Sequence, residues 1–267
     1  MKQTNVEEDD PMTELIYRPA LCAAAAGAFI FLMTSLGSAL VFFFKSFSPR
    51  IHCVILGLTG GIMIAASFWS LLEPSIEASL ARGEPAWLAA SVGVAAGAAF
   101  LALTDLISGK LDRKRSRDRS GLLMLSLTVH NVPEGLAVGV AFGLLRTQPD
   151  AGALAAAFSV AIGIGIQNFP EGAAVSLPMR RAGATPKKSF LMGVLSGAVE
   201  PVAALAGVML VSLSGAVLPW LLAFAAGAML FVAAGEMIPK ACELGRTGAL
   251  AGFTAGFILM MALDVAL

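Results

Sequence analysis

Charged side chains are scarce in this sequence. Asp, Glu, Lys and Arg make up 13% of its 267 residues, against about 25% in an average soluble domain. The mean hydropathy is +0.82, and apolar runs of roughly 20 residues, long enough to cross a bilayer, recur along the chain. The composition therefore predicts an all-α polytopic membrane protein that lies in a lipid bilayer.

Cysteine and basic clusters are also rare. The three cysteines are odd in number and lack CxxC spacing, which argues against a disulfide framework or a thiolate zinc site. The chain has no dense basic domain, so we expect no nucleic-acid partner. Residues 1–17 are polar and lack the basic start of a signal peptide, so we interpret the apolar run after them as a membrane span.

Loop-type residues divide the chain into eight predicted spans, which we expect to form a single transmembrane domain over residues 1–267. The spans are predicted, to within a few residues, at 19–44, 51–72, 86–108, 121–145, 152–179, 189–214, 218–238 and 248–267. Eight spans place both termini on one side of the membrane. Of the 18 Lys and Arg, 14 fall on the opposite side and 4 on the side of the termini. The positive-inside rule then predicts a basic cytoplasmic loop at 109–120 and extracytoplasmic termini, residues 1–17 included.

Lysine and arginine are absent from the interior of the predicted spans, but acids are present there. These acids are Glu134, Glu171, Glu200, Glu236 and, nearer the span ends, Asp105 and Asp264. An acid at the bilayer centre costs about 2.5–3.5 kcal/mol on insertion scales, and a basic partner normally offsets that cost. Two interpretations stay open: the acids are protonated, or they face a polar cavity and bind a cation.

Two similar motifs surround the central acids. The first, HNVPEG, puts His130 and Glu134 four residues apart on one helix face, with Asn131 beside them. The second, QNFPEG, repeats the pattern, and its polar members are Gln167, Asn168 and Glu171. A third acid, Glu200, lies in SGAVEP, about as deep in its span as His130, roughly 14–17 Å at 1.5 Å per residue. Three helices are therefore predicted to bring these side chains together near the midplane.

The prolines of the two motifs fit a binding site. Pro133 and Pro170 lack an N–H and clash with the preceding turn, so we expect both helices to be kinked. Carbonyls freed inside a membrane are tolerated where they line a cavity or bind an ion. The set of imidazole, carboxylate and amide ligands suits Zn²⁺, Fe²⁺ or Mn²⁺ better than Cu⁺. Taken singly, the histidine fits helix packing and the asparagines fit interhelical hydrogen bonding equally well.

These motifs resemble the signature of the ZIP (Zrt/Irt-like) divalent metal transporters, most of all a bacterial branch with HNxPEG followed by QxxPEG. The resemblance covers nearly the whole chain, because the eight-span topology agrees as well. It implies a ZIP-like fold in which spans 1, 4, 5 and 6 move as a bundle against spans 2, 3, 7 and 8. It also implies a homodimer in the bacterial inner membrane that transports Zn²⁺ or a related metal, with no catalytic cofactor.

The resemblance further implies a binuclear centre with two sets of ligands. One position would use His130, Glu134, Gln167 and Glu171, with Met63 nearby. The other would use Asn131, Glu134, Asn168, Glu171 and Glu200. The chain departs from the family at two ligands, since many members have histidine in place of Gln167 and some have aspartate in place of Asn168. The predicted loop 109–120 also lacks the histidines of many relatives.

Three further residues are candidates for the pathway. Glu236 is either an exit ligand or an interfacial acid near Lys240. Asp264 is either an entrance residue or a plain surface acid, and His52 is either an exit ligand or an unremarkable residue at a span end. We expect a transporter of Zn²⁺, Fe²⁺, Mn²⁺ or Cd²⁺ rather than an enzyme. The alternatives are a proton- or sodium-coupled carrier of another solute and an intramembrane metalloenzyme, for which the HExxH motif is missing.

Overall fold

The computed structural model describes residues 18–45, 48–114, 119–146, 149–181 and 183–266, with the backbone alone at 108–114, 119–127, 129–130 and 178. The regular elements of this part of the chain are all helical. They are α2 (Pro19–Ala39), η1 (Leu40–Phe42), α3 (Pro49–Ala66), η2 (Ser67–Leu72), α4 (Glu73–Ala81), α5 (Ala86–Lys114), α6 (Arg119–Gly143), η3 (Leu144–Arg146), α7 (Ala151–Arg181), α8 (Pro186–Gly197), α9 (Val199–Leu213), η4 (Gly215–Val217), α10 (Leu218–Val232), η5 (Ala233–Met237) and α11 (Ile238–Ala266).

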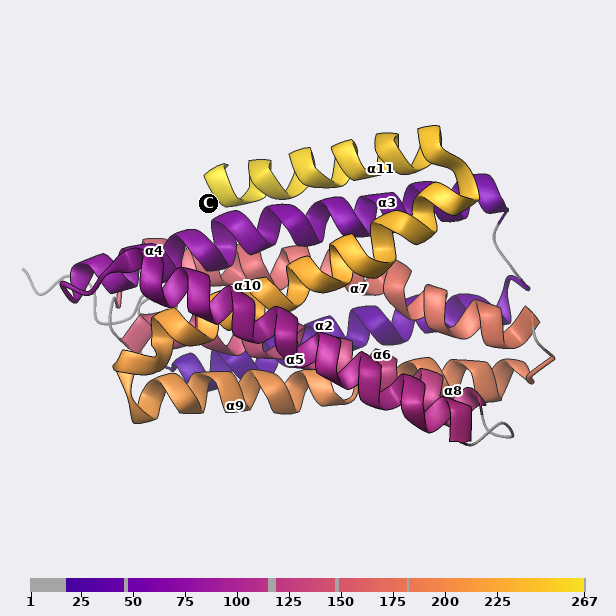
Figure 1. Ribbon diagram of the computed structural model, residues 1–267, viewed down its shortest axis with the longest axis horizontal. Coiled ribbons are helices and arrows are strands. Elements are labelled where there is room, and N and C mark those ends of the chain that lie inside the picture. Colours follow the sequence, from indigo (N-terminus) through magenta and orange to yellow (C-terminus); the bar gives the residue numbers. More distant parts are fainter. Residues whose placement is uncertain (1–17, 46–47, 115–118, 147–148, 182, 267) are drawn as a thin grey trace, which may run out of the picture.

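Six segments of the described chain are long and apolar enough to cross a membrane. They are Pro19–Phe42, Pro49–Ala81, Ala86–Ile107, Ala151–Arg181, Pro186–Leu213 and Gly215–Ala266. The last is 52 residues long, and it doubles back because the helical path is interrupted at Gly245, with φ 168° and ψ 100°. Figure 1 shows the yellow end of α11 running back over α3. The prediction of a polytopic helical membrane protein is confirmed.

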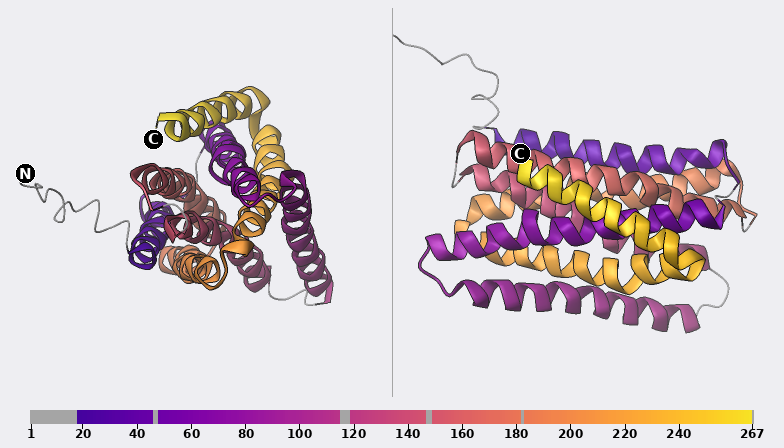
Figure 2. Two further views of the ribbon diagram at one scale, coloured as in Figure 1. Left: turned by 90° about the vertical axis from the view of Figure 1, so that its left-hand side faces the viewer. Right: turned by 90° about the horizontal axis from the view of Figure 1, so that it is seen from above.

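The helices pack as two groups. We call α2, α6, α7, α8 and α9 the site group, because α2 packs on α7 and α9, and α6 packs on α9. We call α3 to α5, α10 and α11 the frame group, because α11 packs on α3 and α10 packs on α5. The end-on view in Figure 2 shows the two groups side by side. They meet mainly where α6 contacts α10 and α5, and where α7 contacts α3.

Glycine brings the helices of each group close together. In the frame group, a Cβ on Gly57 would collide with the carbonyl oxygen of Ala249, and one on Gly252 with that of Val54. In the site group, a Cβ on Gly172 would collide with the carbonyl oxygen of Thr34. Small residues allow this approach in membranes, where packing rather than the hydrophobic effect holds helices together.

The predicted break over residues 73–85 is wrong in extent. The helix continues through the π-helical segment η2 and through α4 as far as Ala81, and the chain turns only near Gly83, with φ 70°. Pro74 has no N–H to donate to the preceding turn, and the wider π turn just before it accommodates that loss. Residues 73–81 therefore lengthen the second membrane segment and carry their acids on a helix.

The basic loop predicted at 109–120 is also largely helical. Helix α5 runs to Lys114 and α6 begins at Arg119, which leaves only 115–118 between the described parts. Lysine, arginine and leucine are good helix formers, so a basic sequence does not by itself end a helix.

The sixth predicted span is broken, which the sequence analysis missed. Helix α8 ends at Gly197 and α9 begins at Val199. Pro201 explains the break, because it has no N–H for the Gly197 carbonyl and its ring clashes with that turn. By contrast, α6 and α7 run through Pro133 and Pro170 without an end, so the kinks predicted there stay a prediction.

Candidate metal centre

The polar residues of the two motifs and Glu200 are buried in the site group. Helices α6, α7 and α9 supply them, and each side chain is at most 5% exposed: Asn131, Glu134, Gln167, Asn168, Glu171 and Glu200. The carboxyl group of Glu134 lies within electrostatic range of both Glu171 and Glu200. The structure thus brings together the amide and carboxylate residues that the sequence predicted to share a site.

Two of the carboxylates are each held through one oxygen. The Gln167 amide donates from Nε2 to Glu134 Oε1 at 2.6 Å. The Asn131 amide donates from Nδ2 to Glu200 Oε1 at 3.0 Å and to the Ser196 carbonyl at 3.0 Å. These bonds fix the carboxylates across helix boundaries and leave their second oxygens available.

A set of buried oxygens accepts no hydrogen bond from the described residues. It comprises Asn131 Oδ1, Glu134 Oε2, Gln167 Oε1, Asn168 Oδ1 and Glu200 Oε2. A buried polar atom without a partner costs free energy, and an unpaired buried charge costs more. All five atoms are carboxylate or amide oxygens, which accept hydrogen bonds and also bind cations, so one bound cation could satisfy several of them at once. The Asn168 Nδ2 donor is also buried without a partner among the described residues.

In the part of the chain that the structure describes, no basic side chain pairs with these acids. Within the described residues, no Lys or Arg forms an ion pair with Glu134, Glu171 or Glu200, and the salt bridge that the structure shows is Arg82–Glu84 on the surface. A purely structural carboxylate in a membrane is usually paired. The described residues therefore supply no basic partner for the acids of the centre.

The break after α8 places Glu200 at a helix start. Glu200 lies in the first turn of α9, where the partial positive charge of a helix N-terminus favours an anion. Pro201 thus has a functional consequence, because it ends α8 just before the carboxylate that α9 presents to the centre.

Two other predicted ligands are placed less fully. The side chain of His130 lies outside the described residues. Met63 is 2% exposed on α3 of the frame group and packs in the apolar core. Among the described side chains, no three His, Cys, Asp or Glu residues converge as a ready metal cage. The described part of the centre is instead a mixture of carboxylates and amides.

The three pathway candidates lie apart from one another. Glu236 is in the π-helical segment η5 and within electrostatic range of Glu171 of the centre. His52 is half-buried near the start of α3, in the range of Lys240. Asp264 accepts hydrogen bonds from Ser70 at 2.8 and 2.9 Å and from Ser159 at 2.8 Å. Neither serine was predicted from the sequence, because a hydroxyl in an apolar helix leaves no recognisable pattern.

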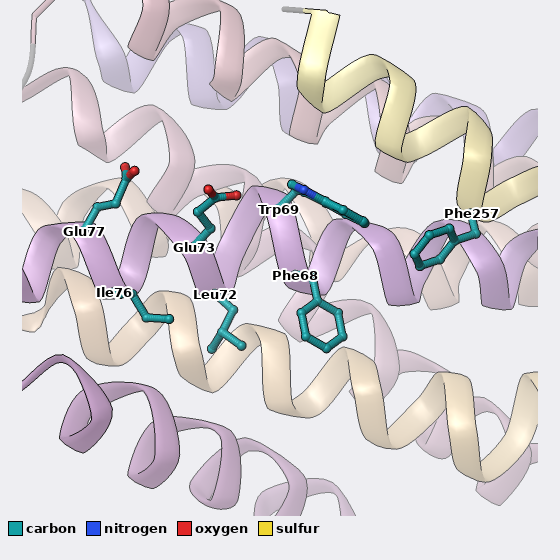
Figure 3. A pocket seen from close by; sticks show the side chains of 7 residues that line it. All are labelled: Phe68, Trp69, Leu72, Glu73, Ile76, Glu77 and Phe257. Atoms are coloured by element: carbon teal, nitrogen blue, oxygen red, sulfur yellow. The ribbon is translucent and has the colours of Figure 1, made fainter.

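A pocket of about 790 Å³ opens beside the second membrane segment. Its lining is Phe68, Trp69, Leu72, Glu73, Ile76, Glu77 and Phe257. Figure 3 shows the two carboxylates on the same side of the helix as the indole, with Phe257 contributed by α11. The described residues that line it include none of the predicted ligands. The sequence analysis missed Glu73 and Glu77, because it assigned them to a loop.

Comparison with known proteins gives the family. The family model described as ZIP zinc transporter matches residues 108–264. Zinc transporter ZIP11 of Xenopus tropicalis is 37% identical, with 94% of this chain and 98% of that protein covered. Zinc transporter GufA of Myxococcus xanthus is 39% identical over 88% of this chain and 94% of its own. Zinc transporter ZIPB of Bordetella bronchiseptica is 34% identical over 92% of this chain and 81% of its own.

These relatives come from animals and bacteria alike, so they support the family as a whole rather than a bacterial branch of it. The matched region contains both PEG motifs and Glu200, which form the buried centre described above. The chain belongs to the ZIP zinc transporter family.

Proposed function

We propose that this protein moves Zn²⁺, and related divalent metals such as Cd²⁺, Fe²⁺ or Mn²⁺, across a membrane into the cytoplasm. The observation that carries the proposal is the set of five buried oxygens that accept no hydrogen bond from the described residues, beside carboxylates that no described Lys or Arg pairs with. The relatives named above, all zinc transporters, support the same cargo.

The chain crosses the membrane eight times in this proposal. Six segments qualify by length and composition. The last of them counts twice, because it doubles back at Gly245, and α6 adds the remaining crossing. The 14 to 4 distribution of Lys and Arg then places both termini outside and residues 109–120 inside. For a bacterial cell this corresponds to the inner membrane.

The centre binds metal through carboxylate and amide oxygens that accept no hydrogen bond from the described residues. Glu134 and Glu200 are each anchored at Oε1 and offer Oε2. Glu171 and the amide oxygens of Gln167 and Asn168 complete the described ligands. His130 would add a nitrogen from the first motif. Neutral amides in place of further charges keep the affinity modest, which lets a carrier release its cargo.

The division into two helix groups supports transport by alternating access. Glycines allow close packing within each group, while the groups meet mainly where α6 contacts α10 and α5 and where α7 contacts α3. Movement of the site group against the frame group would carry the centre from one side to the other. Met63, on the frame group, would then meet the metal on one side only. A homodimer, as the family resemblance implies, leaves this movement within each subunit.

The test is metal uptake by purified protein in liposomes. Wild type should take up ⁶⁵Zn and Cd²⁺, and Glu134→Gln and Glu171→Ala should not. Glu84→Gln is the matched control, because this carboxylate is on the surface and paired with Arg82. Equal uptake by wild type and the two site variants would overturn the assignment. Proton-driven flux that ignores metal would identify a carrier of another solute, and cleavage of a peptide without metal uptake would identify an enzyme.

A further inference from the structure

Thr34 contributes a hydroxyl to the metal centre from a helix that carries none of the predicted ligands. It lies on α2 and is 1% exposed. Its Oγ1 is 2.8 Å from Glu200 Oε1 and 3.2 Å from the Ile30 carbonyl oxygen of its own helix. A hydroxyl has one proton to donate. The shorter bond, to a carboxylate, is the stronger one, because charge-assisted hydrogen bonds are shorter and stronger than neutral ones.

Thr34 and Asn131 act on the same oxygen of Glu200, and the Asn168 amide also lies close to this carboxyl group. Thr34 and Asn131 each donate to Oε1, whereas Oε2 is buried and accepts no hydrogen bond from the described residues. The carboxylate is therefore held from two other helices, α2 and α6, and only one of its oxygens is left for a ligand. An unconstrained carboxylate would offer both.

Space for this arrangement comes from Gly197, the last residue of α8. A Cβ at Gly197 would lie 3.0 Å from Glu200 Oε1 and 3.0 Å from Thr34 Cγ2. Both distances are tighter than ordinary contacts. A larger residue at position 197 would push Thr34 and the Glu200 carboxylate apart. The hydrogen bond between them therefore depends on the small residue at the end of α8.

We propose that Thr34 is a positioning residue that restricts Glu200 to binding metal through one oxygen and thereby favours Zn²⁺ over larger divalent ions such as Cd²⁺. Zinc in proteins takes few ligands at short distances, whereas larger cations take more oxygens and use carboxylates through both atoms. This inference rests on the proposed function, since it takes Glu200 as a ligand of the cargo.

A purely structural role for Thr34 makes a different prediction. Thr34 also packs α2 against α7, where its carbonyl oxygen faces Gly172. Valine has nearly the same shape as threonine and would keep that packing, but it has no hydroxyl. Serine keeps the hydroxyl and loses the methyl group. The pair Thr34→Val and Thr34→Ser therefore separates the hydrogen bond from the packing.

The experiment is uptake of ⁶⁵Zn and ¹⁰⁹Cd into liposomes with each variant. Thr34→Val should raise the KM for Zn²⁺ roughly tenfold, the size expected for losing a hydrogen bond to a charged group. The KM for Cd²⁺ should change less, so the preference for zinc falls. Thr34→Ser should restore both values. Thr104→Val is the matched control, because the Thr104 hydroxyl donates only to the Leu101 carbonyl of its own helix.

Infrared difference spectra of the detergent-purified protein give a second readout that does not depend on transport. In wild type, the separation of the two carboxylate stretching bands on adding Zn²⁺ should indicate binding through one oxygen, and in Thr34→Val it should shift toward binding through both. An unchanged Zn²⁺ to Cd²⁺ preference and unchanged bands in Thr34→Val would overturn the inference. The Glu200→Gln variant separates failure of the ligand assignment from failure of the role given to Thr34. If it transports metal like wild type, Glu200 is not a ligand of the cargo. If it is inactive while Thr34→Val is normal, only the role of Thr34 fails.

Discussion

The acids of the metal centre and Asp264 all lie within predicted spans, but their surroundings differ: the former are buried and Asp264 is half-buried. At the metal centre, Glu134 and Glu200 each have one oxygen that accepts a hydrogen bond and one that accepts none from the described residues. At Asp264, both oxygens accept hydrogen bonds, from Ser70 and Ser159. An acid within a predicted span is therefore weak evidence for metal binding by itself. The unsatisfied second oxygen is what distinguishes a site from a structural contact.

The largest effect should come from removing a charge at the centre. Glu171→Ala is expected to lower the rate of Zn²⁺ uptake at least about 100-fold, since even the partners of metal ligands matter by 10- to 100-fold. Thermal unfolding in detergent should show a folded protein. Uptake within a factor of two of wild type would remove Glu171 from the pathway.

Removing the hydrogen bond that holds Glu134 should affect Zn²⁺ uptake less than removing a charge from the centre. Gln167→Ala leaves Glu134 Oε1 without its 2.6 Å donor and removes an amide ligand, so we expect about a tenfold higher KM for Zn²⁺. Gln167→His, which supplies a nitrogen donor and ligand at this position, should keep uptake and change the order of preference among metals. Uptake competition between Zn²⁺ and Mn²⁺ measures this order.

At Asp264, where both carboxylate oxygens accept hydrogen bonds, a substitution should have a small effect on uptake. Asp264→Asn removes the charge and replaces one of the two acceptor oxygens with an NH2 group, so one oxygen remains to accept a hydrogen bond from Ser70 or Ser159. We expect uptake to fall less than about threefold, the equivalent of an average interhelical hydrogen bond in a membrane of about 0.6 kcal/mol. A loss as large as that of Glu171→Ala would abolish the distinction between Asp264 and the metal centre.

The smallest effect should be that of Ser159→Ala. It removes one of the hydrogen bonds to Asp264, which links α7 of the site group to α11 of the frame group. The free energy of unfolding should fall by about 0.6 kcal/mol, while the equilibrium affinity for Zn²⁺ stays the same. A changed affinity would show that this contact is coupled to the centre.

The centre was largely predictable because its chemistry leaves a pattern in the sequence. An unpaired glutamate in an apolar run stands out, and the repeat in QNFPEG doubles the signal. Thr34, Ser70 and Ser159 leave no such pattern, because a hydroxyl in a membrane helix can bond to its own backbone and needs no partner elsewhere. Their roles depend on which helices become neighbours.

The fold was predicted best where local chemistry decides it. The chain breaks before Pro49 and Pro186 were foreseen, and there Ser48 and Thr185 cap the next helix. The helix through residues 73–81 was not foreseen, because glutamate and proline there resembled a loop. The break at Ala198 had a signal in Pro201, which the sequence analysis interpreted only as a flank of Glu200.

Equilibrium binding of Zn²⁺ to the purified protein tests the central claim most directly. Wild type and Asp264→Asn should bind zinc with similar affinity, and the double variant Glu134→Gln, Glu171→Gln should lose binding while it stays folded. That result would show that the unsatisfied oxygens between α6, α7 and α9 are the site of the cargo. Equal binding by wild type and the double variant, or loss of binding in Asp264→Asn alone, would contradict it.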